Sequence, residues 1–230
     1  QSKRLPRKML CTLSGHPLLA YMAHAALASR LDRVILSTDD EDIAAVGRAC
    51  GVEVPFRRPA ELATDFVTND RVVLHALDWV ASHEGRRYDV VALLQPTAPF
   101  TFPKDIDACL AMLSATGANC CFSASVVSEQ PHWMFVPRDD GGVEPLLPGP
   151  LAGDRQHTQK LPRYLHPSGA VWVVRVQILR DTGRIYCPPM RVVEIEPERA
   201  IDIDTELDLI VAEAVARHRG FAPVGPNEEK

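Results

Sequence analysis

Residues that could do chemistry gather at the two ends of the chain, and the first group is residues 1–8, QSKRLPRK. This stretch carries four cationic side chains around a single proline. Ser2 and backbone N–H groups can donate hydrogen bonds to phosphate oxygens. Lys3, Arg4 and Lys8 can neutralise the phosphate charge. The stretch is therefore either a loop that holds a polyanion or an ordinary solvated basic tail.

The second group is residues 200–208, in which Asp202 and Asp204 are two positions apart. In an extended backbone both carboxylates point the same way, while Ile201 and Ile203 point into the core. Two adjacent carboxylates repel each other unless a cation lies between them. Mg²⁺ takes such hard oxygen ligands together with water and phosphate oxygens. The alternative is that Asp204 caps the helix that follows, and one residue could do both.

Size and charge limit the classes of function. The chain has 230 residues, which suits a single domain over 1–230, with or without a lobe. A net charge of −5 argues against a broad surface for a nucleic acid polymer. The basic loop is thus local, as expected for a small anionic ligand. No apolar run approaches the length of about 18 residues needed to span a membrane, and no signal peptide is visible.

The cysteines predict a reducing compartment. None of them forms a C-x-x-C pair, and most lie in apolar runs. We therefore expect reduced core residues in a cytoplasmic protein and neither a disulfide framework nor a zinc site. The six cysteines are Cys11, Cys50, Cys109, Cys120, Cys121 and Cys187.

Apolar runs and amphipathic runs alternate along most of the chain. Strands are predicted over 33–38, 52–54, 89–94, 120–126, 170–174 and 191–195, and helices over 18–29, 40–50, 69–82, 103–114 and 205–218. This alternation predicts an α/β fold with a doubly wound, mostly parallel sheet between helices. Such a domain opens with a buried strand, whereas this sequence begins in a loop. We therefore expect the first strand to precede residue 1.

Ligands of such sheets bind beyond the carboxyl ends of the strands. Asp39 and Asp40 follow one predicted strand, and Gln95 and Thr97 follow the central one, where two prolines end it. With the loop at Lys3, these turns are expected to share one crevice.

A pair of arginines, Arg57 and Arg58, lies in a polar loop before the third predicted helix. Either could bind phosphate or a base edge, because a guanidinium donates in a planar fork. Both could equally lie on the surface without a ligand.

Residues 127–165 break the alternation and are rich in Pro and Gly. A long irregular stretch is unusual in a compact domain. We predict an extended lobe that lies over the site or against another subunit. Tyr164 near its end is expected to pack against neighbouring side chains.

Five motifs in the same order and spacing resemble one family. They are SKRLPRK at 2–8, RVILSTDD at 33–40, RPAELATD at 58–65, LQPTAP at 94–99 and IDIDTELD at 201–208. The family is the acylneuraminate cytidylyltransferases, which are the CMP–sialic acid synthetases and their bacterial relatives acting on other nine-carbon acidic sugars. The likeness runs from residue 1 to about residue 218.

The resemblance implies a doubly wound, Rossmann-like fold of the nucleotide-diphospho-sugar transferase type, with dimerisation through the extended lobe. It implies that CTP is joined to the anomeric hydroxyl of an acidic sugar with Mg²⁺, or Mn²⁺, and that pyrophosphate is released. By position, Ser2, Lys3, Arg4 and Lys8 would hold the CTP phosphates, and Arg58 and Asn69 would lie by the cytidine. The implied catalytic residues are Lys3, Lys8, Asp202 and Asp204, of which the two aspartates would hold the metal.

On the sugar side, the resemblance implies contacts from Gln95, Thr97, Arg155, Thr158, Gln159, Tyr164 and Ser168. The chain departs from the family pattern at Met9, where the family has Asn, and at Ser168, where it has Asn. Thr158 takes the place of a sugar-binding Arg, for which Arg155 could substitute. The family also places an Arg two residues before position 1. The changes on the sugar side point away from N-acetylneuraminate and toward another acid.

The alternatives left open are legionaminate-like and pseudaminate-like acids, a 3-deoxy-octulosonate-type sugar and a phosphonate. An inactive nucleotide-binding homologue is the alternative of a different class, and Met9 and Ser168 motivate it. The intact residues that argue for an enzyme are Lys3, Lys8, Gln95, Asp202 and Asp204.

Overall fold

The computed structural model describes residues 5–64, 66–147 and 161–223. Its helices are α1 Leu18–Leu27, α2 Glu41–Ala49, α3 Asn69–Glu84, α4 Pro103–Thr116, α5 Val176–Thr182 and α6 Glu206–Arg219. Its longer strands are β3 Val90–Leu94, β4 Cys120–Val126, β7 Leu165–Arg175 and β8 Met190–Glu194. Two short hairpins, β1 Thr12–Leu13 with β2 His16–Pro17 and β5 Phe135–Pro137 with β6 Val143–Pro145, complete the strands.

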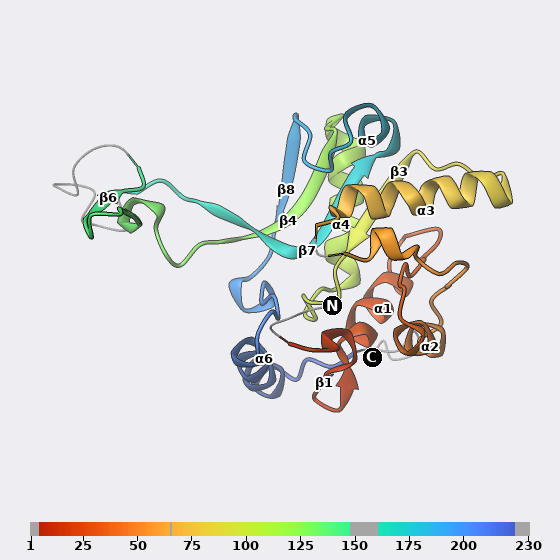
Figure 1. Ribbon diagram of the computed structural model, residues 1–230, viewed down its shortest axis with the longest axis horizontal. Helices are drawn as coiled ribbons and strands as arrows, with labels where there is room; N and C mark the ends of the chain where they lie inside the picture. Colours follow the sequence, from red (N-terminus) through yellow and green to blue (C-terminus); the bar gives the residue numbers. More distant parts are fainter. Residues whose placement is uncertain (1–4, 65, 148–160, 224–230) are drawn as a thin grey trace.

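Helices cover both faces of a four-stranded sheet, so the predicted α/β fold is confirmed (Figure 1). Successive side chains of a strand point to opposite faces. In β7, Val171 and Val173 pack in a cluster with residues of α1 and α4. Trp172 and Val174 pack in another cluster, with residues of α3 and α5. One strand therefore supplies the middle of both layers of the core.

The sheet is mixed, with the order β3-β7-β4-β8. β4 and β8 pair in parallel, whereas β7 runs antiparallel to both of its neighbours, β3 and β4. The expectation of mostly parallel pairing thus needs correction for β7. A strand that runs antiparallel to its neighbour needs no helical crossover. The chain enters β7 from the end of the sheet at which the β5–β6 hairpin lies.

The strands predicted over 33–38 and 52–54 are not formed as such. The two segments run side by side in parallel and share a single bridge, Ile35 with Glu53. The amide of Leu36 donates to the carbonyl of Glu53 over 2.8 Å. With so few hydrogen bonds between them, both segments remain extended chain where the apolar pattern predicted strands.

The predicted helices are present with ends shifted by a few residues, and their end signals explain why. Asp40 caps α2, because its carboxylate accepts from the amides of Asp42 at 2.8 Å and Ile43 at 3.1 Å. Pro103 begins α4, and Gly85 follows α3 with a φ of 68°. Helix α5 was not predicted, because it is short and follows β7 without a break.

All six cysteines are free, in line with the prediction of unpaired cysteines. Cys109, Cys120 and Cys121 are buried, and the other three are half-buried. Among the described residues, no group of three or more His, Cys, Asp or Glu side chains could hold a metal ion. Within the same ranges, no helix is long and apolar enough to cross a membrane.

A hairpin around β5 and β6 stands away from the body of the molecule, at the far end of β4 and β7 (Figure 1). We call the described residues 127–147 and 161–164 the arm. Large apolar side chains of this region are exposed, namely Trp133, Met134, Phe135, Val136, Val143 and Leu146. This hairpin lies within the lobe predicted over 127–165, whose contact with the site or with another subunit stays a prediction, and β5 and β6 were not foreseen.

Candidate active site

The described part of the basic loop ends in a tight turn. A 3-10 helix, Lys8–Leu10, follows Arg7, whose φ of 53° is left-handed. The amide of Leu10 donates to the carbonyl of Arg7 over 2.8 Å, and the Arg7 guanidinium pairs with Asp42 in the first turn of α2. These contacts fix the direction of Lys8. Ser2, Lys3 and Arg4 lie outside the described residues.

Lys8 and Asp204 bring the two ends of the chain together. The Nζ atom of Lys8 donates to Oδ1 of Asp204 over 2.8 Å. The lysine side chain is 11% exposed and the aspartate side chain 41% exposed, so the pair lies at the edge of the interior. The two residues are the predicted phosphate ligand and the predicted metal ligand, and the fold places them in direct contact.

The residue that caps the following helix is Thr205 and not Asp204. Thr205 is the N-cap of α6, and its hydroxyl accepts from the amide of Asp208. The Asp208 carboxylate in turn accepts from the amides of Asp204 at 3.0 Å and Thr205 at 2.7 Å. The capping box therefore orients the backbone at Asp204 and leaves its carboxylate directed at Lys8.

Asp202 lies against the backbone of β7 at Gly169. The φ of Gly169 is +72°, and a Cβ atom there would stand 2.9 Å from Oδ2 of Asp202. Both the backbone angle and the close approach require glycine at this position. Asp202 is exposed, whereas Ile203 beside it is fully buried, as the alternation of residues 201–204 predicted.

The donor set suits Mg²⁺ that is completed by a ligand. Asp202 and Asp204 offer carboxylate oxygens two residues apart, on the side of the segment away from Ile203. Mg²⁺ is commonly held by one or two carboxylates together with substrate phosphates and water. The two aspartates fit this arrangement, and the Lys8 cation beside Asp204 suits the same phosphates.

The turn after β3 is tied to the same segment. The Gln95 amide donates to the carbonyl of Ala170 over 3.1 Å, and the Ile203 amide donates to the carbonyl of Thr97 over 2.8 Å. Gln95 is half-buried and the Thr97 side chain is 9% exposed. We call Lys8, turn 95–98 and segment 201–204 the junction. It contains two of the positions predicted to share a crevice, the basic loop and the Gln95 turn, together with segment 201–204, which that prediction did not include; the turn at Asp39 and Asp40 is not part of it.

Two further sugar-side residues have defined neighbours. The hydroxyl of Ser168 is buried and lies 2.6 Å from the hydroxyl of Ser123 on β4. Tyr164 is half-buried, with its ring centroid 5.6 Å from that of His132, so its predicted packing role is supported. Arg155, Thr158 and Gln159 lie outside the described residues.

Of the predicted cytidine residues, Arg58 lies between α2 and α3, and Asn69 is the first residue of α3. The Arg58 guanidinium donates to the hydroxyl of Ser37 over 3.1 Å and to the Ser37 carbonyl. Burial lowers the pKa of Arg58 from its ordinary value. The ordinary pKa of arginine is so high that the side chain stays protonated. Arg57 donates to the carbonyl of Asp39 over 3.0 Å. Asn69 is exposed at the first position of α3.

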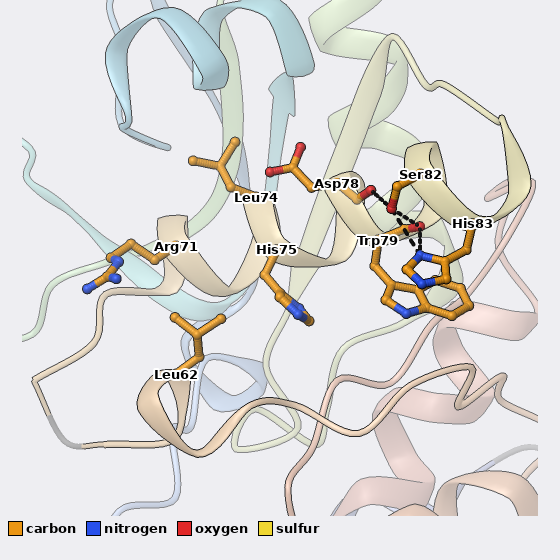
Figure 2. A pocket seen from close by; sticks show the side chains of 8 residues that line it. All are labelled: Leu62, Arg71, Leu74, His75, Asp78, Trp79, Ser82 and His83. Atoms are coloured by element: carbon orange, nitrogen blue, oxygen red, sulfur yellow. Dashed lines mark hydrogen bonds between the residues drawn. The ribbon is translucent and has the colours of Figure 1, made fainter.

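The larger surface hollow lies elsewhere. It measures about 550 Å³ and is lined by Leu62 and by residues on one side of α3, among them His75 and Trp79 (Figure 2). None of the predicted site residues lines it. A second hollow of about 210 Å³ is lined in part by Thr38, Asp39 and Arg57. The junction is therefore identified by its chemistry and its contacts.

Sequence reasoning missed Gly169 and Ser123 as partners of site residues. Gly169 follows Ser168 just before a long apolar run, and a glycine there signals close approach of another group. No local signal marks Ser123, because its partner is 45 residues away.

Comparisons with known proteins identify the family of the chain. A family model described as cytidylyltransferase matches residues 1–137. The CMP-N,N'-diacetyllegionaminic acid synthase of Legionella pneumophila is 31% identical over 92% of this chain and 90% of that protein. The pseudaminic acid cytidylyltransferase of Campylobacter jejuni is 28% identical over 90% and 88%. The N-acylneuraminate cytidylyltransferase of Escherichia coli O18:K1:H7 is 29% identical over 92% of this chain, which spans about half of that protein's length.

Solved structures support the fold. A CMP:2-keto-3-deoxy-manno-octonic acid synthetase in complex with CTP has a TM-score of 0.67 at 17% identity and covers 95% of each chain. A 4-diphosphocytidyl-2C-methyl-D-erythritol synthase from Anaerococcus prevotii has a TM-score of 0.58 at 13% identity and covers 91% of this chain. The family model and the Legionella relative together show that the chain belongs to the cytidylyltransferase family, whose members are nucleotidyltransferases.

Proposed function

We propose that the chain transfers CMP from CTP to the anomeric hydroxyl of a nine-carbon acidic sugar and releases pyrophosphate. The observation that carries the proposal is the 2.8 Å contact between Lys8 and Asp204. It unites a cation for phosphates and a carboxylate for a metal within a chain of the cytidylyltransferase family. The names of the relatives from Legionella, Campylobacter and Escherichia coli all refer to nine-carbon acidic sugars or their cytidylyltransferases.

The chemistry is an in-line displacement at phosphorus. The sugar hydroxyl oxygen forms a bond to the α-phosphorus of CTP, and the bond between that phosphorus and the bridging oxygen to the β-phosphate breaks. Pyrophosphate leaves with the electron pair, and the hydroxyl proton passes to a base. A carboxylate of the pair Asp202 and Asp204 is the candidate base; Asp204 contacts Lys8, and Asp202 is two residues away on the same segment.

Lys8 would stabilise negative charge on the CTP phosphates, together with Lys3, Arg4 and Ser2 of the same loop. Mg²⁺, or Mn²⁺, when bound by Asp202 and Asp204, supplies further stabilisation of charge on the phosphates. Lys8 also holds Asp204 in place before substrate arrives, so the carboxylate needs little reorganisation. Arg58 and Asn69 would contact the cytidine.

Gln95 is the sugar contact that the geometry favours, because the backbone of its turn is bonded to β7 on one side and to segment 201–204 on the other. Thr97, Tyr164 and Ser168 would shape the same side of the site. Arg155, Thr158 and Gln159 would complete it. The family departures at Thr158 and Ser168 favour an acid other than N-acetylneuraminate, of legionaminic or pseudaminic type.

We further propose a homodimer formed through the arm, in a cytoplasmic protein that works in the synthesis of cell-surface polysaccharide. The exposed apolar side chains of the arm support the dimer, because a contiguous apolar surface favours burial against a partner. No nucleic acid polymer or membrane is expected as a partner.

The test is a pyrophosphate-release assay with Mg²⁺ that crosses CTP, UTP, GTP and ATP with a panel of acceptors. The panel holds nine-carbon acids, a 3-deoxy-octulosonate and an aminoalkylphosphonate. Release only with CTP and a nine-carbon acid is expected. Release with the octulosonate or the phosphonate alone would replace the proposed acceptor class. CTP binding without release from any acceptor would favour the inactive homologue.

A further inference from the structure

A buried ion pair joins the first turn of α4 to the 3-10 helix that precedes segment 201–204. Arg199 is 5% exposed and Asp105 is 5% exposed. The Nη2 atom of Arg199 donates to Oδ1 of Asp105 over 3.2 Å, and Nη1 contacts the other carboxylate oxygen. The guanidinium therefore grips both oxygens of one carboxylate, a geometry that fixes orientation as well as distance.

The pair is satisfied on every side. Oδ2 of Asp105 also accepts from the amide of Phe102 over 2.8 Å and so caps the start of α4. The Arg199 guanidinium stacks over the ring of Phe102 with its central carbon 4.6 Å from the ring centroid. The Nε atom of Arg199 donates to Glu196 over 2.5 Å. Buried ion pairs add little net stability compared with apolar residues, so a complete network of this kind points to a role in holding one arrangement.

In the sequence, Asp105 lies close to turn 95–98 and Arg199 lies close to segment 201–204. Asp105 is in the first turn of α4, which begins five residues after the end of turn 95–98. Arg199 ends the 3-10 helix Pro197–Arg199, and segment 201–204 begins two residues later. The hydrogen bond from the Ile203 amide to the Thr97 carbonyl ties the same two stretches at a second point.

We propose that Arg199 is a positioning residue of the reaction. Through Asp105 it fixes segment 201–204 against turn 95–98, so that Asp202, Asp204 and Gln95 keep one mutual arrangement. The inference deepens the proposed function and rests on it for its catalytic part. Arg199 acts through these residues and touches neither substrate.

The decisive variant removes the ion pair without leaving one buried charge alone. Asp105→Asn with Arg199→Met keeps an acceptor for the Phe102 amide and the volume of the side-chain stem. Arg199→Lys keeps a cation and loses the two-point grip. The matched control is Arg219→Met, which removes an exposed ion pair with Glu198 in the same 3-10 helix.

Two readouts are needed, kinetics and backbone hydrogen exchange. In the double variant we expect kcat to fall about 10- to 100-fold and the Mg²⁺ concentration for half-maximal rate to rise, as for residues that orient metal ligands. The KM for CTP should change less than kcat. Exchange of the Ile203 amide should accelerate at least about tenfold more than amides of β4, since the clamp on its bond to Thr97 is gone. For Arg199→Lys, kcat, the Mg²⁺ dependence and Ile203 exchange should lie between those of the double variant and the parent protein. For Arg219→Met, all three should match the parent protein.

A double variant that folds and keeps the parent kcat, Mg²⁺ dependence and Ile203 exchange would overturn the proposal. So would a kinetic loss shared equally by Arg219→Met. If the parent protein releases no pyrophosphate from any acceptor, the proposed function fails, and hydrogen exchange alone still decides whether Arg199 fixes the segment. Unchanged exchange in the double variant then overturns the positioning role.

Discussion

The junction and the arm differ in how far the chain itself covers their side chains. In the junction, Ile203 is fully buried, Thr97 is nearly so, and Lys8 is held by Asp204. In the arm, Phe135 is 46% exposed and Val143 is 62% exposed. The junction is tied to β7 by a hydrogen bond from the Gln95 amide to the Ala170 carbonyl, whereas the arm extends beyond the sheet as a narrow hairpin.

This difference separates two tasks. A site that must place charges on a triphosphate benefits from contacts made before the ligand binds, because preorganised groups stabilise developing charge without reorganisation. An apolar hairpin that its own chain leaves uncovered within the described residues suits contact with a second subunit. The junction should thus be sensitive to single charges, and the arm to the loss of apolar surface.

The largest effect is expected from Asp204→Asn in the junction. The substitution removes a carboxylate charge from the metal position and from Lys8, and kcat should fall about 100- to 1000-fold. The melting temperature should change little, because the Asp204 carboxylate is 41% exposed. Steady-state pyrophosphate release and thermal unfolding measure the two quantities.

Glu206→Gln, an exposed change in the first turn of α6, is the control and should leave kcat unchanged. Activity of Asp204→Asn within a few-fold of the parent protein would remove Asp204 from the reaction.

The next effect concerns the arm. Val143→Asp should weaken self-association at least about tenfold, because a carboxylate buried without a partner costs well over 1 kcal/mol at an interface. The fold should be unaffected, since Val143 is exposed within one chain. Light scattering across a concentration series measures the change, with Asp139→Asn on the same hairpin as the control. An unchanged dissociation constant would show that the arm is not the interface.

Lys8→Ala tests whether the junction lysine serves CTP. Loss of a charge-assisted contact of about 1.5–3 kcal/mol should raise the KM for CTP about 10- to 100-fold. The KM for the sugar should rise less. Lys8→Arg should recover part of the loss, because it restores the charge with a different shape. Equal effects on both substrates would assign Lys8 a purely structural role.

The smallest effect is expected at Glu196, which contacts Arg199. Hydrogen bonding to its own backbone N–H, and then to Arg199, holds the pKa of Glu196 below its ordinary value. The unfolded chain therefore binds this proton more readily, so the stabilisation is present above the unfolded pKa of about 4.3 and is lost as pH falls through the lower folded pKa. Glu196→Gln should reduce the loss of stability between neutral and acid pH by well under about 1 kcal/mol, because the Glu196 side chain is 59% exposed.

Urea unfolding at a series of pH values from about 3 to 7 measures this difference. A variant whose stability falls more steeply with acid than that of the parent protein would contradict the assignment.

Local signals predicted the helices well. Pro103 at the start of α4 and Gly51 after α2 are end signals that depend only on neighbouring residues. The direction of β7 was not predictable, because apolar alternation is the same in parallel and antiparallel strands. The run 33–38 has the composition of a buried strand, yet its partner, 52–54, offers a single bridge. Composition alone does not reveal how much of a ladder a neighbour can provide.

For the site, the sequence predicted residue types and their roles, which stay predictions, but not the contact between Lys8 and Asp204. It did not predict contacts between distant side chains, such as Ser123 with Ser168 or Asp105 with Arg199. Each of these pairs joins residues at least 45 positions apart that carry no common local pattern. Long-range polar pairing of this kind depends on the finished packing.

The strand order of the sheet also governs when the protein can fold during its synthesis. β3 pairs with β7, and β4 pairs with β7 and β8, so within the described residues each strand pair of the sheet needs a strand from beyond residue 164. Until β7 has been made, β3 and β4 lack the strand that pairs with both of them in the described sheet, and their apolar side chains stay exposed to other chains. The arm, which lies between β4 and β7 in the sequence, is made in that interval.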